Sequence, residues 1–150
     1  MDKIEIYTDG AAKGNPGPGG YGVILRSGSF EKEISQGFHH TTNNRMELLA
    51  VIVGLETLRK KENIVSVYSD SKYVVDPINK KWLDRWQKRS WAKVKNVDLW
   101  KRLLMALKDQ KVSFFWIKGH NDHTENERCD QLAVMASKSP TREDEGYAKT

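Results

Sequence analysis

The sequence predicts one α/β domain: a five-stranded mixed sheet, formed by an antiparallel meander plus parallel strands, with helices against its faces. Three observations support this. Strand-like segments come first and then alternate with helical ones, an order typical of a mixed sheet covered by helices. A length of 150 residues fits one domain. An apolar content of 38% and a charged content of 30% are typical of a folded chain. We expect residues 1–150 to form this domain, with a polar, loosely ordered tail at 138–150.

The first forty residues predict the antiparallel meander. Ile4 and Ile6 alternate with polar residues, which indicates a half-buried strand that runs on through Tyr7 and Thr8. A loop rich in Gly and Pro follows. Its short connections suit antiparallel neighbours. The second and third strands are expected at 21–26 and 31–38.

The rest of the chain alternates between helix and strand. A helix is expected from 43 to 60, and because its interior is apolar on nearly every face it should be heavily buried. A capping box at Thr124–Glu127 opens the last helix. The other expected elements are a strand at 64–69, a short helix at 71–77, a basic helix from 80, an amphipathic helix at 97–109, a strand at 112–117 and the last helix to 137.

Four acidic residues lie where the chain changes element: Asp9, Glu47, Asp70 and Asp130. Asp9 and Asp70 each follow a strand, and the carboxyl ends of parallel strands meet at one edge of a sheet. Ionised carboxylates at close range raise one another's pKa or recruit a cation. Hard oxygen ligands suit magnesium or manganese, so the pattern predicts a metal site of the kind used in two-metal phosphodiester chemistry. Four unrelated surface acids are the alternative, because acidic turns are common.

Residues 80–95 concentrate the positive charge of the chain. They hold seven basic residues and one acidic residue, whereas the whole chain has a net charge of +5. Trp82, Trp86 and Trp91 interleave with the charges. Such a segment favours nucleic-acid binding, because cations neutralise phosphates without reading sequence and aromatic rings stack on bases or sugars. A solvated basic face is the alternative.

Other features bound the setting of the protein. No apolar run approaches the roughly 20 residues that span a bilayer, and the first residues enter a strand without a signal-peptide core. Cys129 is the single cysteine, so no intrachain disulfide forms and a reducing, cytoplasmic location is expected. Cys129 adjoins Asp130 on an apolar helix, which favours packing over a role as nucleophile.

Several stretches of the chain together resemble the bacterial type 1 ribonucleases H. They occur in order over most of residues 4–137 and read YTDGAAKGNPGPGGYGVIL, TTNNRMELLA, YSDSKYV, KNVDLWKRL and WIKGHNDHTENERCDQLA. The ending SPTREDEGY is also similar. The resemblance implies a ribonuclease H-like fold. It further implies a magnesium-dependent endonuclease that hydrolyses the RNA strand of RNA–DNA hybrids and leaves 3′-hydroxyl and 5′-phosphate ends.

The resemblance also assigns the catalytic residues. Asp9, Glu47, Asp70 and Asp130 are implied to bind two Mg²⁺ ions, for which Mn²⁺ is a possible substitute, with Asp9 bridging both. His120 is implied to assist proton transfer or product release, a task that suits a histidine near neutral pH. The family usually carries Gly where this chain has an acid at position 122.

Substrate contacts follow from the same resemblance. Asn15, Asn43 and Asn44 are implied to face the minor groove of the hybrid, where amides match the base edges. Thr42 and Asn96 resemble a phosphate pocket for the DNA strand. Capping of the helix at 43 is the alternative role for Thr42, Asn43 or Asn44. The basic segment corresponds to a protruding handle, in which we expect Trp82, Lys88 and Arg89 to contact the hybrid.

The sequence thus favours a monomeric, cytoplasmic ribonuclease H that needs no obligate protein partner and no membrane. Two other functions stay open. A DNA-cleaving integrase or resolvase relative would keep the fold and change the substrate, which the reading groups Asn15, Thr42, Asn43 and Asn44 disfavour. A catalytically silent nucleic-acid-binding module would not need all four carboxylates.

Overall fold

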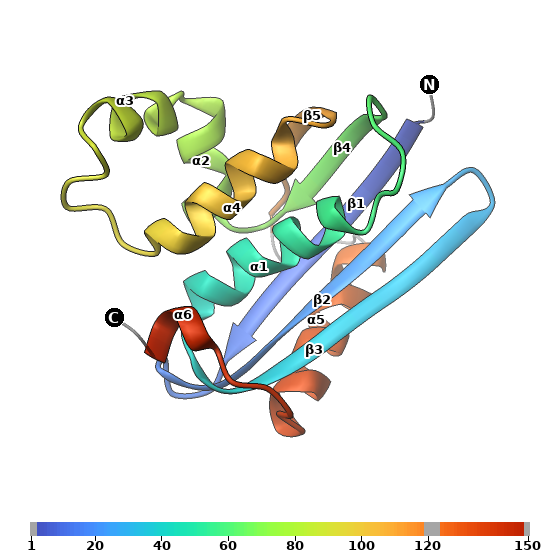
Figure 1. Ribbon diagram of the computed structural model, residues 1–150. Coiled ribbons are helices and arrows are strands. Elements are labelled where there is room, and N and C mark those ends of the chain that lie inside the picture. Colours follow the sequence, from blue (N-terminus) through green and yellow to red (C-terminus); the bar gives the residue numbers. More distant parts are fainter. Residues whose placement is uncertain (1–2, 119–123, 149–150) are drawn as a thin grey trace.

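The computed structural model describes residues 3–118 and 124–148, and a five-stranded sheet forms its centre (Figure 1). The strands lie in the order β3-β2-β1-β4-β5. β1 pairs antiparallel with β2, and β2 with β3, whereas β4 runs parallel to both β1 and β5. The expected mixed sheet is therefore confirmed. The strands are β1 Lys3–Ala12, β2 Gly17–Ser27, β3 Phe30–Thr41, β4 Ile64–Ser69 and β5 Lys111–Trp116.

Helices cover both faces of the sheet (Figure 1). α1 packs against β1 and β2 on one face, with α4 beside it, and α5 packs against β1, β2 and β3 on the other. The helices are α1 Asn43–Glu56, α2 Lys72–Asn79, α3 Trp82–Lys88, α4 Val97–Leu107, α5 Thr124–Lys138 and α6 Glu145–Ala148.

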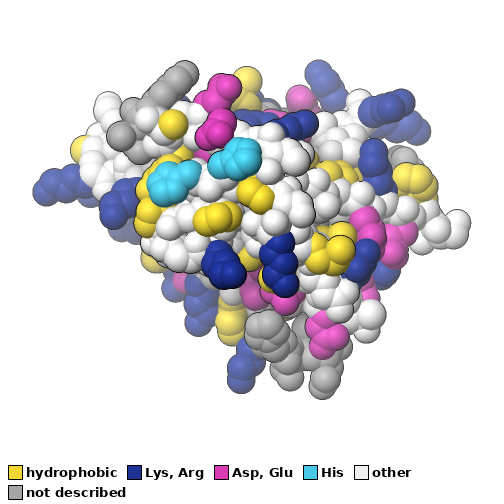
Figure 2. All heavy atoms as spheres, turned by 90° about the horizontal axis from the view of Figure 1, so that it is seen from below, with side chains coloured by type: hydrophobic (Ala, Val, Ile, Leu, Met, Phe, Trp, Pro, Cys, Tyr) yellow, Lys and Arg dark blue, Asp and Glu magenta, His cyan; other side chains and the backbone are white. Residues whose placement is uncertain are grey.

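The lower end of the molecule in Figure 1 brings together the start of α1, α6 and the carboxyl end of β1. Seen from that side, Lys and Arg side chains are spread over the face rather than gathered in one patch (Figure 2). Acidic side chains lie in separate groups, and two histidine side chains lie close together. A surface of this kind suits a ligand that is contacted at several points.

α1 is as buried as its apolar sequence predicts. Ten of its residues are buried, from Arg45 to Leu55. The helix ends at Glu56, earlier than the expected residue 60, because other bonds take over the backbone there. The carbonyl oxygen of Lys60 accepts hydrogen bonds from the side chains of Asn63 at 2.9 Å and Gln110 at 2.7 Å. These bonds shape a turn into β4 instead of a further helical turn.

The basic segment forms a short helix and then an irregular loop. Beyond α3, Ser90, Trp91 and Lys93 have positive φ angles, so the chain cannot continue as a helix. Trp86 packs edge-on against the fully buried Trp100, with ring centroids 5.4 Å apart. Trp91 also packs against the core. Two of the three tryptophans in this segment therefore hold the loop to the domain.

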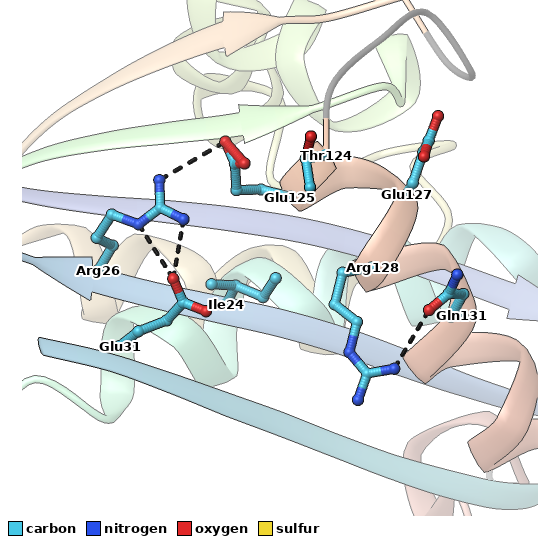
Figure 3. Close-up of a pocket in the computed structure, with 8 residues that line it drawn as sticks. All are labelled: Ile24, Arg26, Glu31, Thr124, Glu125, Glu127, Arg128 and Gln131. Carbon is cyan, nitrogen blue, oxygen red and sulfur yellow. Dashed lines mark hydrogen bonds and ion pairs between the residues drawn. The ribbon is translucent and has the colours of Figure 1, made fainter.

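α5 is held to the sheet by an apolar contact and by ion pairs at its rim. Cys129 and Leu132 are buried against Tyr7 and Ile24. Arg26 of β2 pairs with Glu31 at 2.8 Å and with Glu125 of α5 at 3.6 Å (Figure 3). Exposed pairs of this kind contribute about 0–1 kcal/mol each, so the apolar contact stabilises the docked helix more than the ion pairs do.

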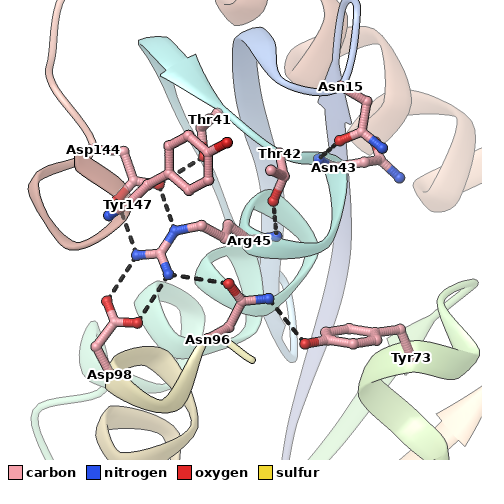
Figure 4. Close-up of polar contacts among 10 residues, drawn as sticks. All are labelled: Asn15, Thr41, Thr42, Asn43, Arg45, Tyr73, Asn96, Asp98, Asp144 and Tyr147. Atoms are coloured by element: carbon pink, nitrogen blue, oxygen red, sulfur yellow. Dashed lines mark hydrogen bonds and ion pairs between the residues drawn. The ribbon is translucent and has the colours of Figure 1, made fainter. Parts of the chain in front are cut away.

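The described part of the C-terminal tail, which ends at residue 148, is docked against the domain, whereas the sequence predicts a loosely ordered tail at 138–150. The amide of His39 donates to the carbonyl of Arg142 at 2.9 Å. Asp144 is buried and accepts from Thr41 at 2.6 Å and from the Arg45 Nε at 2.7 Å (Figure 4). The physical reason is Arg45, which is 1% exposed and requires a buried anion. Polar composition alone does not reveal such a partner.

Arg45→Met should destabilise the protein by about 3 kcal/mol, because it leaves the Asp144 carboxylate buried without its cation. The free energy of unfolding in urea would measure this. Arg102→Met is the matched control, because its pair with Glu56 is exposed and should contribute less than about 1 kcal/mol. Equal losses in the two variants would contradict the importance of the buried pair.

The same cluster sets part of the acid stability. Burial by itself would raise the pKa of Asp144, but hydrogen bonds from Arg45 and Thr41 bring it below its ordinary value of 3.8. A lowered folded-state pKa contributes stability that is present above pH 3.8 and is lost as pH falls further. The difference in unfolding free energy between the original protein and Arg45→Met, measured in urea at a series of pH values, should therefore shrink as pH falls below 3.8, because a protonated Asp144 no longer needs the cation.

Candidate active site

Two of the carboxylates meet at one edge of the sheet. The parallel pairing of β1 and β4 ends at Tyr7 and Tyr68, and Asp9 and Asp70 each lie two residues beyond that pair. The segment around Asp70 is held in place by β5, because the Trp116 Nε1 donates to the carbonyl of Asp70 at 3.0 Å. Asp9 and Asp70 therefore lie close together as expected, although Asp9 lies inside β1, which runs on to Ala12 beside β2, and not at the end of the strand as the sequence predicts.

Glu47 joins them because α1 crosses β1 at very short range. A Cβ atom on Gly10 would lie 2.5 Å from the backbone nitrogen of Glu47, so only glycine permits this approach. Thr42 caps α1 by accepting a hydrogen bond from the amide of Arg45 at 3.2 Å. The capped helix start places Glu47 beside Asp9.

Asp9, Glu47 and Asp70 form a compact acidic group. Each offers one carboxylate oxygen, and these oxygens all lie within 4.8 Å of one another. Asp9 and Glu47 are buried, with exposed fractions of 5% and 6%, and Asp70 is half-buried. Oxygen atoms at this spacing are suitable ligands for a divalent cation.

Asp130 lies on the other side of Asp9. α5 approaches β2 so closely that a Cβ on Gly22, the residue opposite Asp9, would overlap the carbonyl oxygen of Cys129. The Asp130 carboxyl interacts with that of Asp9 and raises its pKa. Asp130 therefore lies next to Asp9, although it is not one of the three residues whose carboxylate oxygens lie within 4.8 Å of one another. His120 lies outside the described residues.

The electrostatics of the group favour binding of a cation. Burial raises the pKa of Asp9 most, and the Asp70 and Asp130 carboxyls raise it further, to about 8. Burial, and then the charges of Asp9 and Asp70, also raise the pKa of Glu47 well above its ordinary 4.5. Among the described residues, the buried Oε1 of Glu47 has no hydrogen-bond partner. A divalent cation would offset the repulsion between the carboxylates and would give the Oε1 of Glu47 a partner. These residues therefore fit such an ion.

A separate cavity gathers most of the residues expected to bind substrate. Its volume is about 720 Å³, and Asn15, Thr42, Asn44 and Asn96 line it. Asn43 contributes its backbone amide, which donates to the Oδ1 of Asn15 at 2.9 Å and so fixes the loop before β2 (Figure 4). The structure thus brings together residues up to 81 positions apart in the sequence.

Similarity to known proteins identifies the family of the chain. A family model described as RNase H matches residues 1–138. The chain belongs to the ribonuclease H family. Ribonuclease H from Photorhabdus laumondii is 53% identical over 150 residues, which cover 97% of this chain and 95% of that protein. The sequence-based resemblance is confirmed at the level of the family.

Solved structures of ribonucleases H show the same fold. LC9-RNase H1, a type 1 RNase H with the type 2 active-site motif, is similar with a TM-score of 0.84 and 28% identity, over 94% of this chain and 74% of that chain. LC11-RNase H1, solved in complex with an RNA/DNA hybrid, is similar with a TM-score of 0.63 and 28% identity, over 90% and 96%. The ribonuclease H-like fold is therefore confirmed.

The handle residues of this ribonuclease H lie apart from the cavity. Trp82 is half-buried in α3, and Lys88 and Arg89 are exposed at its end. The Nζ of Lys80 lies 5.6 Å from the centroid of the Trp82 ring, a cation–π contact. Lys88 and Arg89 therefore present their charges to solvent from a short, separate element.

Sequence reasoning missed the residues that support the ribonuclease H cavity. The Arg45 Nη1 donates to the Oδ1 of Asn96 at 3.3 Å, and the Asn96 Nδ2 donates to the hydroxyl of Tyr73 at 2.9 Å. Asp144 and Tyr147 come from the tail. Arg45 lies 51 residues from Asn96 and 99 residues from Asp144, and Tyr73 lies 23 residues from Asn96, so no local pattern could have indicated these contacts.

Asp9→Asn should raise the thermal stability of the metal-free protein. A folded-state pKa of about 8 against an ordinary 3.8 means that stability falls as pH rises between these values. The variant lacks this titration, so its gain in unfolding midpoint should grow between about pH 5 and pH 9 to more than about 3 °C. Thermal unfolding in chelator would measure it.

Asp84→Asn, an exposed acid on α3, is the control for Asp9→Asn and should change the midpoint little at either pH. A gain from Asp9→Asn that shrinks as pH rises would show that the acidic group is not under the electrostatic stress described above.

Proposed function

We propose that this protein is an endonuclease that hydrolyses the RNA strand of RNA–DNA hybrids by two-metal-ion catalysis and leaves 3′-hydroxyl and 5′-phosphate ends. The observation that carries the proposal is the acidic group, held at the carboxyl edge of the sheet in a member of the ribonuclease H family. Its oxygens, its burial and its raised pKa values fit a site that binds divalent cations.

Asp9, Glu47, Asp70 and Asp130 would hold two Mg²⁺ ions, and Mn²⁺ is a possible substitute. Asp9 is suited to be shared between the two ions, because its carboxyl group interacts with Asp130 and also belongs to the acidic group. Two ions held there would supply a hydroxide nucleophile and would stabilise the leaving 3′ oxygen. The protein orients the four carboxylates and keeps Glu47 and Asp9 away from bulk water. His120 is proposed to assist proton transfer or product release.

Hybrid recognition is proposed for the cavity residues. Asn15, Asn43 and Asn44 would face the minor groove, and Thr42 and Asn96 would bind a phosphate of the DNA strand. The amide and hydroxyl donors in the cavity suit these partners. The likeness to a ribonuclease H solved with an RNA/DNA hybrid supports the substrate class. Only one strand of a hybrid carries 2′-hydroxyls, which gives a physical basis for strand choice.

The setting is proposed to be a monomer in the cytoplasm without an obligate protein partner. The single cysteine, Cys129, is buried, as suits a chain that needs no disulfide in a reducing compartment. Within the part of the chain that the structure describes, no helix has the length and apolar character to cross a bilayer. Sedimentation of the purified protein would test the oligomeric state.

The proposed function is tested with one sequence prepared as an RNA–DNA hybrid, an RNA duplex and a DNA duplex, each with Mg²⁺ and with chelator. We expect cutting of the RNA in the hybrid, with Mg²⁺. Asp9→Asn should lower the rate at least about 1000-fold, because it removes the ligand shared by both ions, yet retain hybrid binding in chelator. Cutting of the DNA duplex would instead indicate an integrase-like or resolvase-like activity. Binding without cutting under every metal would indicate a silent binding module.

The handle is tested by Lys88→Ala with Arg89→Ala in one protein. If both cations contact phosphates, the slope of log affinity against log salt for the hybrid should fall by about one to two units. Lys3→Ala with Lys111→Ala is the matched control, because both residues lie at the strand ends opposite Asp9 and Asp70. An unchanged affinity and slope in the Lys88–Arg89 variant would remove the handle from the binding surface.

A further inference from the structure

The C-terminal tail forms part of the cavity that holds the proposed substrate-binding residues. Gly146 and Tyr147 line it together with Thr42, Asn44 and Asn96. Gly146 and Tyr147 lie at least 50 residues along the chain from these three residues, and Figure 4 shows the ring of Tyr147 above the side chains of Arg45 and Asn96. The tail therefore shapes the surface that a nucleic acid would meet.

A buried arginine fixes the tail and the cavity as one unit. The Arg45 guanidinium donates to Asp144 through its Nε at 2.7 Å and to Asn96 through its Nη1 at 3.3 Å. The backbone amide of Tyr147 donates to the Oδ1 of Asp144 at 3.3 Å. One side chain therefore positions both a cavity amide and the turn that presents Tyr147.

The Tyr147 ring lines the cavity and is not part of the buried hydrophobic core. It is half-buried, and its centroid lies 5.4 Å from the ring of the exposed His40, with the planes tilted by 50°. The contact with His40 limits where the ring can turn. One aromatic surface thus borders a cavity whose other lining groups are mostly polar.

The lining of the cavity matches a sugar–phosphate backbone. Thr42, Asn44 and Asn96 offer hydroxyl and amide donors, and Lys95 offers a cation. Asp98 also lines the cavity, but its carboxylate accepts two hydrogen bonds from Arg45, at 2.9 and 2.7 Å, so its negative charge is partly offset by a cation that it shares with Asp144. The apolar face of a sugar or a base packs well on an aromatic ring.

We propose that Tyr147 is a substrate-binding residue whose ring packs against a sugar or base of the hybrid while the neighbouring donors hold the adjoining phosphate. The carboxylates of the acidic group are not among the described residues that line this cavity, so the bound backbone segment is separate from the scissile phosphate. The proposal rests on the proposed hybrid nuclease function and adds a determinant of affinity to it.

The test compares Tyr147→Ala, Tyr147→Phe and Tyr147→Leu with the original protein. The dissociation constant for a labelled RNA–DNA hybrid is measured by fluorescence anisotropy in chelator at low salt. Loss of a stacking ring should weaken binding about fivefold or more in the Ala and Leu variants. Tyr147→Phe keeps the ring and should bind within about twofold. Cleavage with Mg²⁺ at hybrid concentrations far below the dissociation constant should slow in the Ala and Leu variants by the same factor as binding weakens, and should stay within about twofold in Tyr147→Phe.

Two controls separate a binding role from a structural one. Phe30→Ala removes an exposed aromatic ring at the opposite end of β2 and β3 and should leave binding unchanged. Tyr147→Leu preserves bulk against the tail, and its unfolding midpoint is measured beside its affinity. Weakened binding at an unchanged midpoint supports the contact.

Original affinity in the Leu variant overturns the proposal, even where Ala destabilises the tail. If the original protein does not cleave the hybrid, the proposed function fails. If it cleaves while the Leu variant binds normally, only the Tyr147 inference fails.

Discussion

Electrostatic repulsion among buried carboxylates is the constraint on which the rest of the site depends. Three carboxylate oxygens within 4.8 Å of one another, two of them on buried residues, are unfavourable unless protons or cations are shared among them. The fold enforces this arrangement at backbone level. β1 occupies the centre of the sheet, Gly10 admits α1 on one side, and Gly22 admits α5. The acidic group therefore cannot relax by moving apart, and its raised pKa values record the strain that a metal ion would relieve.

The second constraint is the buried positive charge of Arg45. A guanidinium that is 1% exposed needs anions, and it finds them in Asp98 at the start of α4 and Asp144 in the tail. Because Arg45 also donates to Asn96, the pairing of a buried charge fixes the shape of the cavity. The docked tail thus follows from the desolvation of one arginine, and the tail in turn carries Tyr147 to the cavity wall.

The acidic group and the cavity differ in size, burial and charge, and therefore suit different tasks in such an enzyme. The acidic group is small, buried and electrostatically stressed, which suits binding of compact divalent cations. The cavity of about 720 Å³ is lined by several neutral donors together with Lys95 and Asp98, which suits an extended backbone. The basic handle borders this cavity through Lys95, whereas Lys88 and Arg89 are exposed outside its lining. Two of its three tryptophans, Trp86 and Trp91, pack against the hydrophobic core and so hold the handle to the domain. Binding of metal ions, binding of a nucleic-acid backbone and additional positive charge are therefore suited to different parts of one domain.

The sequence by itself determined the sheet, most element boundaries and the four acidic candidates, because strand periodicity and the position of Asp9 and Asp70 just after apolar, strand-like runs are local signals. It also indicated the family, through motifs that read contiguously along the chain. Which charged groups lie close enough to interact was decided only by the tertiary structure. The polar sequence of the tail does not reveal that Asp144 pairs with the buried Arg45. In the same way, the sequence of α1 does not reveal that Gly10 allows β1 to approach Glu47 closely. Burial and pairing between distant segments arise only on packing, so no local pattern encodes them.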